Sequence, residues 1–495
     1  MTVHPKLPSA PRKFQNLIGG SWGDSQGGEI VRLSPAHGVP VSVVPRGTAA
    51  DVDKAVAAAR RRFEGGGWAE IPAASRAAIL RKAADLILQQ KDELALIETL
   101  ESGKPLWQSV NEVTGAADLW YYASGQAQAM HGETFNNLGH DSLGLVLREP
   151  IGVVGLITPW NFPFYILAER LPFILAAGCT VVMKPSEHTS STTLMMGRIL
   201  EQAGLPEGVV NIVTGYGDPV GQAIVNHMDI DMVSFTGSTR VGRSTVIASA
   251  ANIKKVSLEL GGKNPVVVTA DADLDKAADG IVYGVLHNAG QCCVSGSRLI
   301  VHESVEKPLT ERILELMGKV RVGDPLVPEN RVGAIVNETQ MTRILGLIDQ
   351  GKSQGGKLVT GGARMEPRAG YFVEPTLFTG VTRDMTIARE EVFGPVLGIS
   401  TFRSTADAIR MANDTEYGLA ATIWSSDLRK SMDLMRGIRA GRMWINTTIT
   451  GGPEMPIGGY KQSGLGRETG PSGIDEYTEV KSVIVDLGAR QPWVI

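Results

Sequence analysis

Cysteine is scarce in this sequence, with three residues in a chain of 495. Three thiols cannot build a disulfide framework, and reduced thiols are typical of cytoplasmic proteins. No run approaches the roughly 18 apolar residues that a membrane-spanning helix needs, and residues 1–20 lack the apolar core of a signal peptide. The formal net charge of -4 argues against a general nucleic-acid surface. We therefore expect a cytoplasmic protein that binds neither membranes nor nucleic acid.

The chain is longer than the roughly 250–300 residues at which a single core stops growing, so we expect at least two domains. Its composition, 43% hydrophobic and 20% charged, is typical of globular proteins. From about residue 145, short β-rich runs alternate with helical segments, which predicts a parallel sheet with helices on both faces. Ligands bind such sheets beyond the carboxyl ends of the strands. The expected strands are 151–158, 180–184, 209–213, 232–236 and 256–259.

Other segments carry local cues. Thr48 and Asp51 resemble a capping box in front of an alanine-rich helix. Apolar periodicity predicts a further helix over 75–100 and an amphipathic one over 305–320. The glycine-rich segment 351–370 predicts loop and turn.

Two of the three cysteines, Cys292 and Cys293, are adjacent and follow Gly290. Adjacent cysteines bridge only with distortion of the peptide between them, and no CxxC or Cys/His cluster surrounds them to indicate a metal. A nucleophile or a buried apolar residue remains, and burial preferences favour the second. Sequence proximity alone does not make His287 a partner base, and Cys179, in an apolar run, is expected to pack in the core.

Polar residues follow several expected strands. Gly237 and Ser238 form a turn that opens a helix, where backbone N–H groups can bind an anion, although a plain strand-to-helix turn reads the same way. Lys184 and Glu187 at another strand end can be solvated loop charges. Glu259 is flanked by leucines, so it is either a structural acid or a carboxylate whose pKa is raised for base chemistry.

Between Pro159 and Pro163 stands Asn161, which can be a turn former or a rigid amide donor for an oxyanion. It belongs to the first of seven short motifs along the chain, namely PWNFP at 159–163, KPSE at 184–187, FTGS at 235–238, ELGGK at 259–263, GQCC at 290–293, EVFGP at 391–395 and GGYK at 458–461. In this order they resemble the NAD(P)-dependent aldehyde dehydrogenase superfamily, from about residue 15 to the end. Each motif is weak alone, but the seven together are specific.

The resemblance implies thiol chemistry. The family's nucleophile falls on Cys293, and Cys292 fills a variable position of the same motif. The general base falls on Glu259, and the oxyanion donors fall on the Asn161 amide and the backbone N–H of Cys293. Ser295 departs from the residue usual at its position and leaves the nucleophile's position unaffected. The implied activity is NAD-dependent oxidation of an aldehyde to a carboxylic acid through a thiohemiacetal and a thioester, which water hydrolyses.

NAD is the implied cofactor, with no metal. Lys184 and Glu187 would lie at the adenosine ribose. The glutamate predicts a preference for NAD over NADP of at least roughly tenfold, since it would repel the extra phosphate. The residues implied at the cofactor are Ile157, Thr158, Trp160, Lys184, Glu187, Gly217, Phe235, Gly237, Ser238, Val241, Leu260, Glu391 and Phe393.

The implied fold is α/β of the aldehyde dehydrogenase type, with two Rossmann-like parallel-sheet domains and a small β oligomerisation element. The NAD-binding domain would comprise 1–130 and 149–260, the catalytic domain 261–476, and the oligomerisation element 131–148 and 477–495. Exposed strands of that element pair between subunits in the family, so a homodimer or homotetramer is expected.

The aldehyde itself is left open. Positions that commonly carry aromatic residues along the family's substrate tunnel fall on Tyr165, Gly451 and Ile457, which implies a wider cavity, while Glu169 and Arg170 can face either the tunnel or solvent. Two other kinds of protein remain as alternatives, a cysteine hydrolase that needs no nucleotide and a catalytically silent relative. Acyl transfer to coenzyme A is the alternative within the enzyme class, and Glu259 favours release to water instead.

Overall fold

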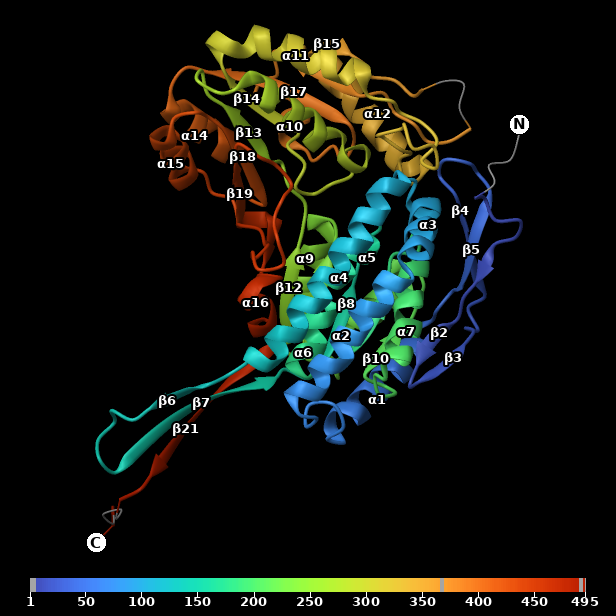
Figure 1. Cartoon of the computed structure of the whole chain (residues 1–495), viewed down its shortest axis with the longest axis vertical. Coiled ribbons are helices and arrows are strands. Elements are labelled where there is room, and N and C mark those ends of the chain that lie inside the picture. Colours follow the sequence, from blue (N-terminus) through green and yellow to red (C-terminus); the bar gives the residue numbers. More distant parts are fainter. Residues whose placement is uncertain (1–5, 366–368, 489–492, 495) are drawn as a thin grey trace.

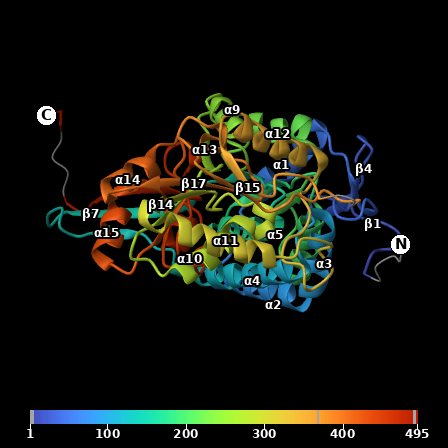
Figure 2. The same cartoon turned by 90° about the horizontal axis from the view of Figure 1, so that it is seen from above.

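The computed structural model describes residues 6–365, 369–488, 493 and 494. Within them, two large sheets and two three-stranded sheets make up the strand framework, with helices packed around the large sheets (Figure 1). The small sheets lie at opposite ends of the molecule in both views (Figures 1 and 2). The expected α/β class is confirmed.

The first large sheet has eight strands in the order β20-β12-β11-β8-β9-β10-β2-β3, and its five central neighbours run parallel. Its strands are β2 (Asn16–Ile18), β3 (Ser21–Gly23), β8 (Val153–Ile157), β9 (Thr180–Lys184), β10 (Val210–Ile212), β11 (Met232–Thr236), β12 (Lys255–Glu259) and β20 (Gly464–Leu465). The five strands expected from sequence are therefore confirmed. Their continuous apolar runs are explained by burial on both faces.

Alternate residues of β9 show the two buried faces. Val181 and Met183 join the core made with α2, α4 and α7, whereas Val182 joins a second core with α1 and α8. The helices on this sheet are α1 (Ala49–Glu64), α2 (Ala73–Gln89), α3 (Lys91–Ser102), α4 (Leu106–Ala129), α5 (Pro163–Ala168), α6 (Leu171–Ala177), α7 (Ser191–Ala203), η1 (Gly217–Gly221), α8 (Gln222–Asn226), α9 (Thr239–Ser249) and α16 (Gly470–Asp475).

The second large sheet has seven strands, parallel except for the β15–β16 pair at one edge. In sheet order they are β15 (Lys357–Thr360), β16 (Thr376–Thr379), β17 (Val396–Phe402), β14 (Arg298–His302), β13 (Pro265–Val268), β18 (Ala420–Trp424) and β19 (Arg442–Ile445). The helices around it are α10 (Leu274–Leu286), η2 (His287–Gly290), η3 (Glu303–Val305), α11 (Glu306–Lys319), α12 (Glu338–Ser353), α13 (Thr386–Arg389), α14 (Thr405–Asn413), α15 (Leu428–Gly437) and η4 (Lys461–Ser463).

One small sheet projects away from the body (Figure 1). It consists of β6 (Glu133–Phe135), β7 (Ser142–Pro150) and β21 (Thr478–Asp486), in the order β21-β7-β6. The long β21–β7 pairing joins a C-terminal strand to the middle of the chain. The other small sheet, at the N-terminal side, contains β1 (Arg12–Lys13), β5 (Pro40–Pro45) and β4 (Glu29–Leu33).

Local expectations fare unevenly. The capping box is confirmed, because the Asp51 N–H donates to the Thr48 hydroxyl and the Asp51 carboxylate accepts from the Thr48 N–H. The helix expected over 305–320 is confirmed as η3 and α11. The single helix expected over 75–100 is wrong, since Gln90 leaves helical geometry and separates α2 from α3. The loop expected over 351–370 is wrong in part, because exposed β15 lies inside it and residues 366–368 fall outside the described part.

Candidate active site

The carboxyl ends of three neighbouring strands bring the predicted site together. β8, β11 and β12 are adjacent and parallel, and Thr236 lies opposite Glu259 in their register. A cavity of about 280 Å³ opens beyond these ends. Its lining joins the strand ends to the cysteine loop and to residues far along the chain, which are Pro159, Trp160, Asn161, Thr236, Gly237, Ser238, Glu259, Leu260, Gly261, Cys293, Gln340, Arg343, Glu391 and Phe393.

The cysteine loop follows α10 through a tight turn. Asn288, Ala289 and Gly290 have positive φ in succession, and a Cβ on Gly290 would clash with the backbone of Gly394, so glycine is needed there. The Asn264 amide donates to the carbonyls of Cys293 at 2.7 Å and Ser295 at 2.9 Å. These bonds hold the backbone on both sides of the thiol.

The two adjacent cysteines differ in exposure. Cys292 is buried at 4% exposed, and burial raises the pKa of its thiol to about 12. Cys293 is half-buried and lines two cavities. Burial, with Cys292, Glu391 and Glu259 nearby, raises the pKa of Cys293 well above its ordinary value. In the protein alone the thiol is therefore favoured over the thiolate.

Glu259 ends β12 and reaches both cavities while remaining only 8% exposed. Within the described residues its Oε1 has no hydrogen-bond partner. Burial raises its pKa to about 8, opposed by Arg170 and reinforced by Glu468 and Glu169. A carboxylate with a free oxygen and a raised pKa can accept a proton near neutral pH.

Asn161 follows β8 and is buried. Its amide donates to the Gln291 carbonyl at 3.2 Å, and its own carbonyl accepts from the Asn288 amide at 2.8 Å. These two bonds tie the PWNFP segment to the cysteine loop. The amide therefore lies beside Cys293, where a donor could meet an oxygen of a bound substrate.

Several residues predicted at the cofactor meet around the 280 Å³ cavity. Ser238 caps α9, where its hydroxyl accepts from the Val241 N–H. Trp160 and Phe393 face each other edge to face at 5.3 Å between ring centroids. The Glu391 carboxylate accepts from the Gly262 N–H at 2.9 Å.

Other predicted cofactor residues lie outside this cavity's lining. Ile157, Thr158 and Phe235 are buried at or next to the strand ends, and Gly217 begins η1. Lys184 is buried with its Nζ donating to the Pro185 carbonyl, 3.6 Å from the Glu187 carboxylate. Glu187 lines a separate cavity of about 260 Å³.

Sequence reasoning missed Gln340 and Arg343, which come from α12. The Gln340 amide donates to the Phe393 carbonyl at 2.9 Å, and the Arg343 guanidinium donates to the Glu391 carbonyl at 2.7 Å. They hold the backbone of two residues expected at the cofactor, Glu391 and Phe393. No local pattern distinguishes them from ordinary surface residues of an amphipathic helix.

A second cavity of about 330 Å³ reaches the other side of Cys293. Tyr165 and Ile457 line it, and so do Glu169 and Arg170. Gly451 is not among its lining residues. Several aromatic rings from other elements also line the space. The complete lining is Trp107, Gln108, Asn111, Glu112, Gly115, Phe162, Tyr165, Ile166, Glu169, Arg170, Thr236, Glu259, Tyr283, His287, Cys293, Ile449 and Ile457.

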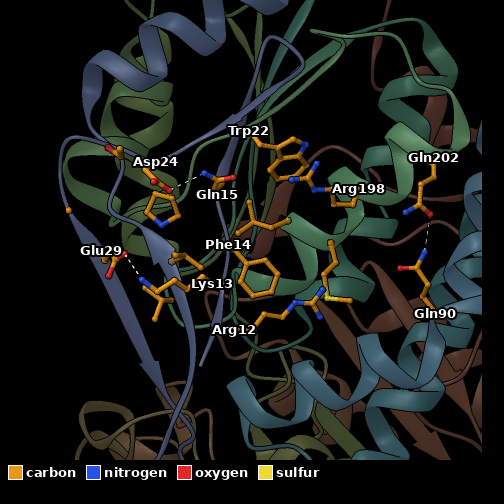
Figure 3. Close-up of a pocket in the computed structure, with 17 residues that line it drawn as sticks. Arg12, Lys13, Phe14, Gln15, Trp22, Asp24, Glu29, Gln90, Arg198 and Gln202 are labelled. Carbon is orange, nitrogen blue, oxygen red and sulfur yellow. Dashed lines mark hydrogen bonds and ion pairs between the residues drawn. The ribbon is translucent and has the colours of Figure 1, made fainter. Parts of the chain in front are cut away.

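A larger cavity, about 720 Å³, lies near the N-terminal sheets and contains none of the predicted site residues (Figure 3). Its cations are paired or stacked. Arg12 forms an ion pair with Glu93 and Lys13 with Glu29, while Arg198 stacks on Trp22. This cavity therefore offers no unpaired charge to a ligand among these groups.

Cys179 is fully buried in the core, as predicted. His287 stacks on Phe162 and lines the 330 Å³ cavity, and burial lowers its pKa to about 4. Within the described residues, no cluster of three or more metal-ligating side chains occurs. No helix in that same part of the chain is long and apolar enough to cross a bilayer.

Fold and site together define an α/β protein with a thiol and a buried carboxylate where two cavities meet. The sequence profile of the aldehyde dehydrogenase family matches residues 22–483. Aldehyde dehydrogenase family 2 member C4 of Arabidopsis thaliana is 42% identical, over 99% of this chain and 98% of the relative. The crystal structure of an NAD-dependent aldehyde dehydrogenase from Sinorhizobium meliloti is 51% identical, covers 99% of this chain and 98% of its own, and superposes with a TM-score of 0.98.

An aldehyde dehydrogenase from Bacillus cereus, solved as its NAD+ complex, is 40% identical with a TM-score of 0.95, covering 98% of this chain and 99% of its own. The chain belongs to the aldehyde dehydrogenase family. It is an oxidoreductase that converts an aldehyde to a carboxylic acid with NAD as cofactor.

Proposed function

We propose that Cys293, Glu259 and Asn161 carry out this oxidation, with Cys293 as the nucleophile. The observation that carries the proposal is the position of the Cys293 thiol between two cavities, with the buried Glu259 carboxylate lining both. One cavity then serves the cofactor and the other the aldehyde. Cys292 lines neither cavity and is structural.

The residues around the 280 Å³ cavity fit NAD. Thr236 Oγ1 is buried without a hydrogen-bond partner among the described residues, and the N-terminus of α9 presents N–H groups to an anion. Trp160 and Phe393 provide flat walls. We assign the cofactor to this cavity, and the ribose to Lys184 and Glu187 at the end of β9. The remaining members of the cofactor set are Ile157, Thr158, Gly217, Phe235, Gly237, Ser238, Val241, Leu260 and Glu391.

In the first half of the reaction, the Cys293 sulfur adds to the aldehyde carbon. Its proton passes to Glu259, which has the free oxygen and a pKa of about 8, and is released from there to solvent, so that Glu259 is a carboxylate again before the second half. The Asn161 amide and the Cys293 backbone N–H stabilise the oxygen that gains charge. NAD, when bound, accepts the hydride that leaves the substrate carbon, and a thioester on Cys293 remains.

In the second half, water attacks the thioester carbon. Glu259 takes the proton from that water, the carbon–sulfur bond breaks, and Cys293 regains its thiol while the carboxylic acid departs. Aldehyde, NAD+ and water are thus converted to acid, NADH and a proton. Glu259 favours water as acceptor over coenzyme A, because it can activate the water directly.

Replacement of each cysteine by alanine tests the assignment. Cys293→Ala should abolish NADH formation and leave no acyl group on the enzyme by mass spectrometry, while NAD binding measured by calorimetry persists. Cys292→Ala is the matched control and should retain most of the activity, because its thiol only fills core volume. Loss of activity in the control alone would reject the nucleophile assignment.

The division into domains and the assembly belong to the same proposal. We assign 1–130 with 149–260 to cofactor binding, 261–476 to catalysis, and 131–148 with 477–495 to oligomerisation. The seven-stranded sheet draws all its strands from the catalytic range, in support of this division. Two elements of that range cross the division, namely β20, which pairs with β12, and α16, which packs against α6 and α4.

Exposed apolar side chains on an edge strand and on a helix support a homodimer or homotetramer. β21 is an edge strand with exposed Val480 and Ile484, and α9 exposes Ile247. Proteins commonly cover an exposed apolar strand edge, and a second subunit can provide this cover. Cytoplasmic residence is proposed from the three free thiols, which suit a reducing compartment.

A further inference from the structure

The 330 Å³ cavity assigned to the aldehyde carries more acid than base. Three carboxylates line it, those of Glu112, Glu169 and Glu259, against one guanidinium, that of Arg170. His287 adds no positive charge at neutral pH, because burial lowers its pKa to about 4. Burial raises the pKa of Glu112 and Glu259 to about 8 and that of Glu169 to about 7, so these acids hold their protons until a cation enters and favours the carboxylate form.

Two of these four charged groups already have dedicated partners. Glu112 forms an ion pair with Lys104, which also pairs with Glu98 at 3.2 Å. Arg170 is paired through its Nε with buried Glu468 at 3.3 Å. One lysine thus serves two acids, and the arginine's closest partner lies outside the cavity. Glu169 and Glu259 are left without a matched cation.

Glu259 has its place in the reaction, so Glu169 is the acid to explain. It follows α5, and its side chain is 12% exposed. In the described part of the chain its carboxylate accepts no hydrogen bond, and its only ion-pair contact is Arg170 Nη1 at 3.9 Å. A buried carboxylate so poorly satisfied is costly. Burial accordingly raises its pKa to about 7, with Arg170 and then Arg442 opposing the shift.

The rest of the wall is suited to a cation with apolar substituents. Trp107, Tyr165 and Tyr283 line the same cavity, and aromatic faces attract alkylammonium groups. Phe162 also lines it, but its ring already contacts the Lys104 ammonium and His287. Arg442, which also influences Glu169, is outside the lining and donates to the Thr450 carbonyl. A negatively charged substrate would meet the two acids without a matched cation, Glu169 and Glu259.

We propose that the substrate is an aldehyde with a cationic nitrogen, an ammonium or alkylated ammonium group, at the end away from the carbonyl, and that Glu169 binds this cation. The proposal rests on the function proposed above, with the carbonyl at Cys293. Glu169 is a specificity residue and takes no part in bond making.

Two aldehydes of the same shape test it. One is butanal with a trimethylammonium group on its terminal carbon, and the other is its neutral tert-butyl isostere. We expect the wild-type kcat/KM to favour the cation by at least about tenfold, equivalent to about 1.4 kcal/mol. In Glu169→Gln the ratio should fall to within about threefold of unity, mainly through a higher KM for the cation, while Glu169→Asp retains part of the preference. Glu64→Gln on the exposed face of α1 is the matched control and should keep the wild-type ratio.

If the Glu169 variants do not fold, inhibition of the wild-type enzyme gives the same test. Butyltrimethylammonium should compete with the aldehyde and should inhibit more strongly than neutral butanol. Equal use of the two isosteres, or a preference for a carboxylate-bearing aldehyde, would overturn this inference and leave the oxidation itself intact. Failure to form NADH from any of these aldehydes, with NAD bound, would instead contradict the proposed function.

Discussion

The assignment of Glu259 as the base makes a quantitative prediction about pH. Burial raises the pKa of Glu259 to about 8, and the base is active only when it is deprotonated. Roughly one-tenth of the carboxyls would be ionised at pH 7, about half at pH 8 and roughly nine-tenths at pH 9. Hydrolysis of the thioester should therefore speed up by about fivefold from pH 7 to pH 8 and by roughly tenfold in all by pH 9.

Hydrolysis can be followed without hydride transfer by acylating the enzyme with a nitrophenyl ester. The burst of nitrophenol counts acylated sites, and mass spectrometry then follows the loss of the acyl group. Glu259→Gln should keep a burst near one per site, slow the loss of the acyl group by roughly a hundredfold or more, and remove its pH dependence. With an aldehyde and NAD, rapid mixing should likewise give one NADH per site and then stall.

Two results would refute the reasoning. A wild-type hydrolysis rate that does not change between about pH 6 and about pH 9 would mean that no group with the pKa of buried Glu259 controls the step. A pH profile that survives unchanged in Glu259→Gln would assign the control to another group. Either result would remove Glu259 from the mechanism while leaving Cys293 in place.

Two further predictions concern the cofactor and the assembly. The wild-type kcat/KM should be at least roughly tenfold higher with NAD than with NADP. Glu187→Ser should narrow this ratio mainly by raising kcat/KM for NADP, because a carboxylate 3.6 Å from Lys184 is removed. Equal specificity constants in the unmodified enzyme would show that Glu187 does not face the ribose. Ile484 on β21 is 76% exposed in the single chain, and Ile484→Lys should lower the molecular mass measured by light scattering. Met228 is 59% exposed and lies outside that sheet, so Met228→Lys should leave the mass unchanged. An unchanged mass in Ile484→Lys would count against β21 as an interface.

The strands of the first large sheet were predictable because burial on both faces requires apolar residues at every position. β8 and β9 are buried throughout, so each reads as an unbroken apolar run. Exposed β15 has no such run, and the glycines around it predict a loop instead. The break at Gln90 was also hidden, since apolar periodicity continues across it from α2 into α3. Hydrophobic patterns in a sequence reflect which residues are buried, so they are weak in segments that are exposed to solvent.

The site was predictable in part for the same reason. A glutamate between leucines predicted a buried carboxylate, and Glu259 is one. The two cysteines gave no local sign of which faces the cavities, so the assignment to Cys293 came from the family resemblance. Lys104 and Arg343 were missed, because their partners lie on other elements and only the tertiary fold brings them together.

The acid excess around Cys293 links the chemistry to the choice of substrate. Burial, with Glu391 and Glu259 among its neighbours, keeps the Cys293 pKa high, so the resting enzyme holds a thiol, and a thiol reacts poorly with oxidants and adventitious electrophiles. A cation bound at Glu169 adds positive charge to the same cavity and lowers the pKa of the thiol as well as that of Glu169. The proposed substrate would thus help to form the nucleophile that attacks it, whereas a neutral isostere would leave the thiol as it is. Preference for a cationic aldehyde should therefore be accompanied by faster thiol addition, visible as a faster NADH burst for the cation.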